Sequence, residues 1–209
     1  GTAVFETWIA SEALSNSLLM LSKRIAVFNA WLLLVSAIAW LGLAAGSMGE
    51  GWTDTVNPTT IALVLTATSF GKVWIANLAL AMICVIAAHW LGPRRRAILA
   101  TLSTLALAAL AFVGHAVAET GLLGVASEAS QVVHLLASGF WFVSLLSLVL
   151  LLRRIRDPRF ALDADLALRR FSGLGHVAVA LALASGLANS WLVLRGATLS
   201  WTSTYHVLL

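Results

Sequence analysis

Histidines are the first candidates for chemistry in this sequence, because imidazole is the commonest protein ligand for metal ions. His115 ends one apolar run, and His134 lies about one and a half turns inside the start of the next. Two helices joined by so short a connection are expected to be antiparallel neighbours, which brings both imidazoles to similar depth. Imidazole suits copper, zinc and iron alike. The pair therefore predicts a shared metal site and leaves the metal open.

Two further residues fall on the same side of the expected topology. Met48 ends the first apolar run, and its thioether is a soft ligand that favours Cu(I). His206 opens the last run. We interpret the nearby Glu119 and Glu128 as solvated loop carboxylates. The predicted metal ligands are thus His115, His134, Met48 and His206.

A second pair of histidines supports an alternative interpretation. His89 lies near the inner end of one run and His176 near the inner start of another. A transmembrane di-haem cytochrome needs one histidine pair near each face of the membrane, on facing helices. His115 with His134 would then hold an outer haem b, and His89 with His176 an inner one. The residues by themselves leave a metal ion and haem as rival hypotheses.

The elements that must position these residues are membrane-spanning helices. Of the 209 residues 60% are hydrophobic and 11% charged, whereas soluble domains carry about 25% charged residues. A span needs about 20 apolar residues, and five runs qualify, at 25–47, 73–91, 97–118, 129–152 and 174–194. A sixth begins near Tyr205 and is cut off at Leu209, so we expect part of a longer protein. We predict an all-α polytopic bundle.

Two shorter segments complete the expected organisation. Residues 59–70 are too few to span and predict a short interfacial helix that leads through Gly71 into the second span. Residues 1–24 have a loose apolar spacing and predict either an amphipathic segment on the cytoplasmic side or the end of a missing span. We expect residues 25–209 to form one transmembrane domain in contact with the lipid bilayer.

The charges predict the orientation of the bundle. Of thirteen Lys and Arg residues, all but Lys72 and Arg195 fall on one side of the alternating spans. Cytoplasmic loops carry such an excess of positive charge, so we expect the arginine-rich loops to be cytoplasmic. The basic residues lie in short loops between apolar runs, so we interpret them as topology signals and expect no nucleic-acid partner.

Other classes of function are excluded by missing motifs. Cys84 is the one cysteine, so an intrachain disulfide is impossible. Neither Gly-x-Gly-x-x-Gly nor Gly-Lys-Ser/Thr occurs, so we expect no nucleotide partner. Any transport would then be driven by a gradient or by binding of the cargo in the cytoplasm. We expect the protein not to be an enzyme.

Several stretches together resemble the copper resistance protein D (CopD) family of bacterial inner-membrane proteins. They are Leu65-Thr-Ala-Thr-Ser-Phe-Gly-Lys-Val-Trp74, Gly114-His115-Ala116, Val133-His134-Leu135-Leu136-Ala137 followed by Trp141, Arg170-Phe171-Ser172, and Ser47-Met48-x-Glu50. The resemblance covers roughly residues 24–209, and the order and spacing of the stretches are its specific part. This chain departs from the family pattern at Tyr205-His206, where Tyr-Gly is usual, and at His176, where an apolar residue is usual.

The resemblance implies copper as the metal. It implies a multi-pass protein of the bacterial inner membrane that moves copper from the periplasm toward the cytoplasm or delivers it to a copper enzyme, with a periplasmic copper-binding protein as a possible donor. The family-like stretches surround His115 and His134 but not His89 and His176. We therefore favour a copper protein over a di-haem electron carrier.

Overall fold

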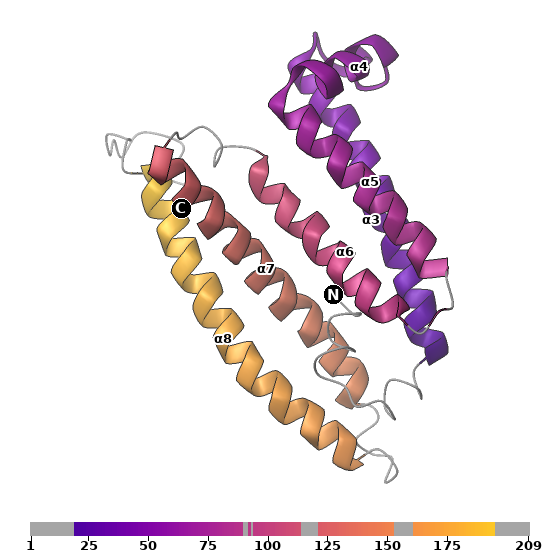
Figure 1. Cartoon of the computed structure of the whole chain (residues 1–209), viewed down its shortest axis with the longest axis vertical. Coiled ribbons are helices and arrows are strands. Elements are labelled where there is room, and N and C mark those ends of the chain that lie inside the picture. The colour runs from indigo at the N-terminus through magenta and orange to yellow at the C-terminus, as the bar shows by residue number, and fades with distance from the viewer. Residues whose placement is uncertain (1–18, 90–91, 93, 114–120, 153–160, 195–209) are drawn as a thin grey trace.

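The computed structural model describes residues 19–89, 92, 94–113, 121–152 and 161–194, and every element within these ranges is a helix (Figure 1). The expected all-α fold is confirmed. In chain order the elements are α3 (Leu19–Met48), the 3-10 turn η1 (Trp52–Thr55), α4 (Pro58–Ala67), α5 (Ser69–His89), α6 (Arg95–Ala109), the 3-10 turn η2 (Leu110–Phe112), α7 (Gly121–Leu152) and α8 (Ala161–Leu194).

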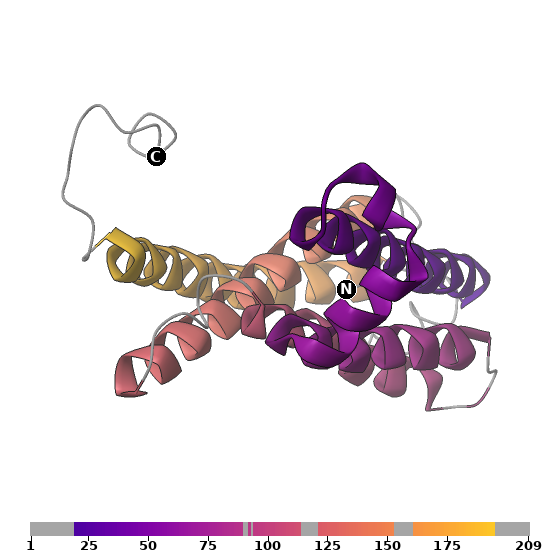
Figure 2. The same ribbon diagram turned by 90° about the horizontal axis from the view of Figure 1, so that it is seen from above.

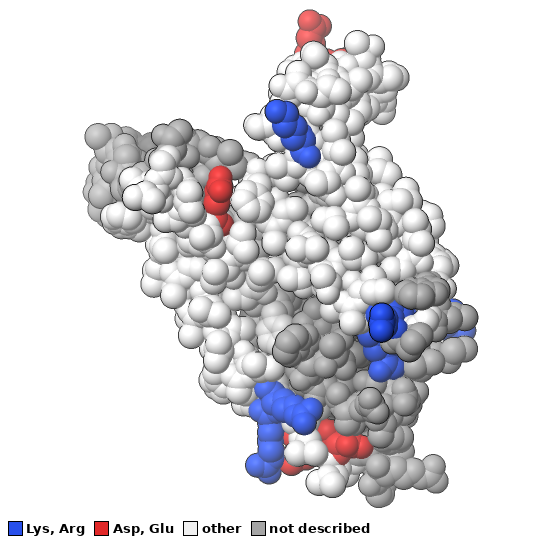
Figure 3. Space-filling view, viewed as in Figure 1, with Lys and Arg blue, Asp and Glu red and all other residues white. Residues whose placement is uncertain are grey.

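Four described segments are long and apolar enough to cross a membrane: Lys23–Met48, Ser69–His89, Arg95–Phe112 and Ala161–Leu192. They contain the first predicted span, all but the last two residues of the second and of the fifth, and most of the third. The fourth lies within α7, which is helical throughout 129–152 but is not one of these four, so a total of five spans stays a prediction. In Figure 3 the charged side chains lie toward the ends of the helices, and the middle of this face is white.

Several helix ends differ from the prediction, because hydropathy locates an apolar stretch and not the end of a helix. α7 begins at Gly121 and α8 at Ala161, well before the predicted 129 and 174. The added first turns of α8 are polar and contain an Arg169–Asp165 ion pair of 2.8 Å. The third span was predicted to stay helical to 118, which is wrong: η2 ends at Phe112 and Val113 is extended, with φ −123° and ψ 134°.

The helices pack in two groups (Figures 1 and 2). In the first group α5 packs against α3 and α6, and α4 and η1 cover one end of α3 and α5. In the second group α7 packs along α8. The two groups meet where α6 and η2 contact α7. At this boundary a Cβ atom on Gly139 would lie 2.7 Å from Cδ2 of Leu107, so the missing side chain lets α6 and α7 approach each other closely.

Hydrogen bonds to main-chain carbonyls fasten the first group. The indole N–H of Trp74 on α5 donates to the carbonyl of Ala37 on α3 at 3.0 Å. The side-chain amide of Asn77, also on α5, donates to the carbonyl of Ala106 on α6 at 3.1 Å. Both donors are buried. Polar side chains between membrane helices fix their register in this way, because lipid offers no competing partner.

Thr68 separates the short helix from the span that follows it. Its backbone is extended, and its hydroxyl accepts a hydrogen bond from the N–H of Gly71 at 2.9 Å, which caps the start of α5. The prediction of a short helix before the second span is confirmed, but the break was expected at Gly71. Gly71 instead lies inside α5, where α4 crosses it: a Cβ atom there would collide with the backbone of Val64 and Leu65.

Asp54 holds the connection between α3 and α4 in place. Its carboxylate accepts hydrogen bonds from the backbone N–H of Glu50 at 2.6 Å, from the hydroxyl of Thr60 at 3.0 Å and from the amide of Asn57 at 3.1 Å. These donors favour the charged form and lower the pKa of Asp54 below its ordinary value, with the Glu50 N–H as the largest cause. One carboxylate thus joins the end of α3, η1 and the start of α4.

Replacing Gly71 with Ala is expected to destabilise the protein, because the new methyl group meets main-chain atoms of α4 that cannot rotate away. Such overpacking costs about 1–3 kcal/mol. The matched control is Gly173→Ala in α8, where a Cβ atom meets nothing within 4 Å. Thermal unfolding of the purified protein in detergent measures both variants. Equal unfolding temperatures for the two would contradict the close crossing of α4 over α5.

The lowered pKa of Asp54 predicts a pH dependence of stability. A carboxyl group whose pKa is lower in the folded state stabilises the fold when the pH is above the pKa that the group has in the unfolded chain. This contribution disappears as the pH falls through the folded-state pKa. We expect the unfolding temperature to decrease when the pH is lowered below about 4. The substitution Asp54→Asn should remove part of that decrease. Glu50→Gln is the control, because the exposed Glu50 contributes only its backbone N–H. A wild-type acid profile in Asp54→Asn would be evidence against this role.

Candidate metal site between α7 and α8

His134 on α7 faces α8. Its Nδ1 lies 3.0 Å from the carbonyl oxygen of Ala182 and 3.2 Å from the hydroxyl of Ser185. Gly186 makes room for the ring, because a Cβ atom there would lie 3.3 Å from its Cε1. The imidazole is half-buried between the two helices. Small residues on α8 thus create a recess that a histidine fills from α7.

These contacts determine which ring nitrogen can bind a metal. A carbonyl oxygen only accepts hydrogen bonds, so Nδ1 of His134 carries the hydrogen and donates it to Ala182. In the neutral ring Nε2 then holds the free lone pair. Histidines that bind metals typically donate the other ring N–H to a backbone carbonyl, which orients the ring and fixes its tautomer. His134 is therefore already oriented as a ligand through Nε2.

Further polar contacts between α7 and α8 lie beside His134. The hydroxyl of Ser130 donates to the carbonyl of Ser185 at 3.3 Å, and the amide of Asn189 donates to Oε1 of Gln131 at 2.7 Å. Oδ1 of Asn189 is buried without a hydrogen-bond partner. We call Ser130, Gln131, His134, Ser185 and Asn189 the polar seam. A polar group buried between membrane helices is costly unless it has a hydrogen-bond partner or serves a function.

The sequence prediction named His134 and missed the other members of the polar seam. A signal was present, because Ser127, Ser130, Gln131 and His134 recur at spacings of three and four residues, which is one face of a helix. Ser185 and Asn189 have the same spacing on α8. The prediction placed His134 about one and a half turns inside the apolar run that starts at 129, and the helix that contains this run begins earlier, at Gly121. His134 lies about 20 Å along α7 from that first residue.

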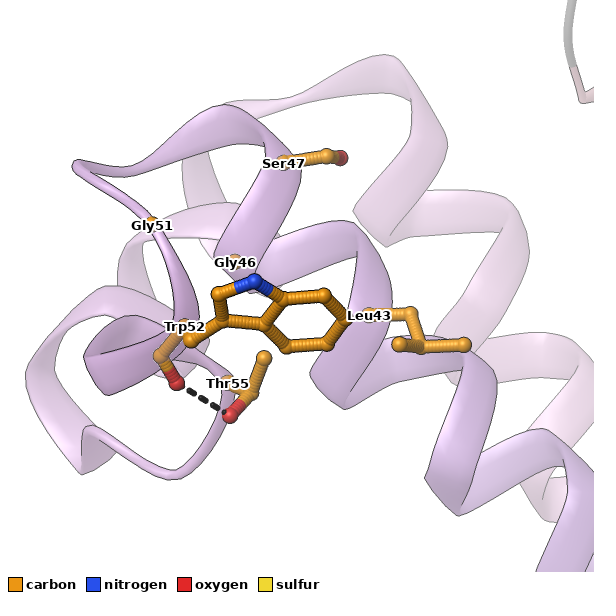
Figure 4. Close-up of a pocket in the computed structure, with 6 residues that line it drawn as sticks. All are labelled: Leu43, Gly46, Ser47, Gly51, Trp52 and Thr55. Carbon is orange, nitrogen blue, oxygen red and sulfur yellow. Dashed lines mark hydrogen bonds between the residues drawn. The ribbon is translucent and has the colours of Figure 1, made fainter.

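Met48 is the second predicted ligand that the structure describes. It ends α3 with 53% of its surface exposed. It borders a cavity of about 470 Å³ that Glu50, Asp54, Asn57 and Thr60 also line. Both carboxylate oxygens of Asp54 are engaged in the hydrogen bonds given above. In the same connection between α3 and α4, Trp52 lies against Leu43 and Gly46 of α3 (Figure 4). The Thr55 hydroxyl donates a hydrogen bond to the Trp52 carbonyl at 2.6 Å.

The described structure does not bring Met48 and His134 together. Met48 belongs to α3, which packs against α5, α4 and η1, whereas His134 belongs to α7, which packs against α8, α6 and η2. The other two predicted ligands, His115 and His206, lie outside the described residues. Within the described ranges, no group of three or more His, Cys, Asp or Glu side chains is placed to hold a metal ion.

The histidines of the proposed inner haem pair lie on helices of different groups. His89 ends α5 and His176 lies in α8, and each Nδ1 hydrogen-bonds a carbonyl four residues earlier, of Val85 and Ser172 respectively. α5 packs with α3, α4 and α6, while α8 packs with α7 (Figure 1). The two rings are therefore not placed to hold one haem between them, and the di-haem alternative gains no support.

Known proteins similar to this chain identify its family. Residues 1–125 match the family model described as the copper resistance protein D-like, N-terminal domain. Inner membrane protein YebZ of Escherichia coli is 34% identical over 197 residues, covering 92% of this chain and 66% of that protein. Copper transport protein CutJ of Bacillus subtilis is 30% identical, covering 83% of this chain and 34% of that protein.

A third relative is copper resistance protein D of Pseudomonas syringae pv. tomato, which is 28% identical over 185 residues, 85% of this chain and 59% of that protein. This chain thus spans just under two thirds of the length of one of these relatives and less of the other two. No solved structure matches. The resemblance seen in the sequence is confirmed, and the chain belongs to the copper resistance protein D-like family.

Proposed function

We propose that this chain binds copper in the bacterial inner membrane and moves it from the periplasm toward the cytoplasm. Relatives named as a copper transport protein and as copper resistance protein D support copper as the cargo. A relative named as an inner membrane protein and four helices fit to cross a membrane support the location. Because the chain spans only part of these relatives, the activity of the whole protein belongs to the proposal.

One observation carries the proposal, namely the orientation of His134. Its Nδ1–H is committed to Ala182, so Nε2 is the nitrogen that can bind a metal ion. A ligand on a helix, with its tautomer fixed by backbone, is held more precisely than one on a loop. The neighbouring hydroxyl and amide groups are uncharged and can solvate an ion in transit without trapping it.

Two of the other three proposed ligands extend the site around His134. His115 and His206 would supply further imidazoles. Met48 would supply a thioether that favours Cu(I), at the end of α3 and away from His134. Met48 is therefore proposed as a separate point of capture, before copper reaches the histidines. A periplasmic copper-binding protein is the proposed donor, and the arginine-rich loops are proposed to be cytoplasmic.

A cavity between α7 and α8 supports the inward route. It has a volume of about 450 Å³, and Trp141, Ser172 and His176 contribute to its lining. His176 is exposed and donates its Nδ1–H to Ser172, which leaves Nε2 free as it does in His134. Copper released from His134 would meet this second imidazole farther along the same pair of helices.

Replacing His134 with Ala is expected to weaken copper binding by at least about tenfold, since even indirect partners of a metal ligand are worth that much. The matched control is His89→Ala, which removes an exposed imidazole on α5, outside the α7–α8 pair. Copper per protein and Cu(I) affinity, measured against a competing chelator on the purified full-length protein, test this. Unchanged binding in His134→Ala, or an equal loss in His89→Ala, would refute the assignment.

The same preparation distinguishes copper from haem. The proposal predicts a purified protein without a Soret band, whereas a Soret band in the wild-type protein that disappears in His134→Ala would support a b-type haem.

Transport direction is tested in membrane vesicles of defined orientation. We expect right-side-out vesicles that contain the full-length protein to accumulate copper, and His134→Ala vesicles to match protein-free ones. Copper inside the vesicles is measured by elemental analysis after external copper has been chelated. Accumulation only in inside-out vesicles would reverse the direction, and none in either orientation would limit the protein to binding.

A further inference from the structure

Arg95 is a buried cation whose guanidinium is not fully hydrogen-bonded. It begins α6, only 6% of its surface is exposed, and its Nη1 has no hydrogen-bond partner. Charged side chains are almost never fully buried unless they are paired. An unpaired guanidinium N–H at this position is therefore a feature that an anion would satisfy.

The register of α6 determines where this guanidinium lies. Arg95, Leu99 and Ala106 are all buried, at spacings of four and seven residues, so they share one face of the helix. Leu99 belongs to the same core cluster as Ala30 of α3 and Cys84 of α5. Arg95 therefore lies one turn beyond that cluster, where the interface of α3, α5 and α6 comes to an end.

The backbone at this position also favours an anion. Arg94 at the N-cap makes no side-chain capping bond, and the first turn of α6 contains no acidic residue. The partial positive charge of a helix N-terminus is thus left without a counter-charge from its own helix. The N–H of Arg95 bonds to the carbonyl of Gly92 at 3.1 Å, so the helix N-terminus would favour a phosphate group mainly through its partial charge.

The surroundings are basic. Arg94 is exposed beside Arg95, and Lys23 and Arg24 lie near the start of α3, in the helix that contributes to the same cluster. Figure 3 shows blue atoms gathered where α6 begins. The acidic residues of the described ranges lie in other elements: Glu50 and Asp54 between α3 and α4, Glu128 in α7, and Asp163 and Asp165 in α8. Asp165 is paired with Arg169.

We propose that Arg95 and the N-terminus of α6 bind the phosphate group of an anionic phospholipid at the end of the α3–α5–α6 interface. A lipid is favoured over free phosphate because α6 is fit to span the membrane, so its end lies at headgroup depth. Basic pockets between membrane helices bind acidic headgroups in this manner. The site is independent of copper and joins three helices through one headgroup.

The test is a thermal unfolding titration of the full-length protein in detergent with phosphatidylglycerol, with phosphatidylcholine and with inorganic phosphate. A ligand that binds only the folded state raises the unfolding temperature. We expect phosphatidylglycerol to raise it and the other two to have little effect. An equal rise with phosphatidylcholine would overturn the anion site, and an equal rise with inorganic phosphate would overturn the lipid assignment.

Variants locate the site. Arg95→Gln is expected to weaken phosphatidylglycerol binding at least about tenfold, whereas Arg169→Gln, which removes an exposed arginine of α8, should leave it unchanged. Ala97→Glu covers the case in which Arg95→Gln fails to fold, because Ala97 is exposed and a carboxylate in the first turn repels phosphate while it suits the helix. Wild-type lipid binding in Ala97→Glu, or an equal loss in Arg169→Gln, would overturn the proposal.

Discussion

The structure depends on one constraint: within lipid, a polar side chain must find its partner in the protein. Each of the two groups of helices meets this constraint with side chains that bond to the main chain of a neighbour. In the first group Trp74 bonds to Ala37, and Asn77 to Ala106. In the second group the ring of His134 bonds to Ala182. Apolar side chains that face lipid give little preference for one register between two helices. These hydrogen bonds therefore determine which helices pair and in which register.

The sequence predicted the fold class and the apolar core of most spans, because a segment that lies in lipid can be recognised from its hydropathy alone. It did not predict the helix ends, which depend on particular contacts. The break before α5 is set by the Thr68 hydroxyl and not by Gly71, which is small because α4 crosses there. The first turns of α8 are polar and helical at once, so a hydropathy reading assigns them to a loop.

The candidate site was predicted in part. His134 stands out as an ionisable group in an apolar run, and a family-like stretch surrounds it. The other members of the polar seam, Ser130, Gln131, Ser185 and Asn189, were missed, because an uncharged polar residue can be assigned a role only when the register of two helices is known. The same limit applies to Met48. Residue type suggested a thioether near the histidines, but which helices pair cannot be read from a single sequence, and α3 and α7 have different neighbours.

The boundary between the two groups of helices has a mechanical consequence. The hydrogen bonds named above lie inside one group or the other, while the boundary is a close apolar contact at which Leu107 meets Gly139. Sliding or tilting there breaks none of these bonds, so the molecule would deform as two stiff blocks that rock against each other along α6 and α7. Such rocking would leave His134 seated on α8 throughout, because the imidazole and its recess move with the same block.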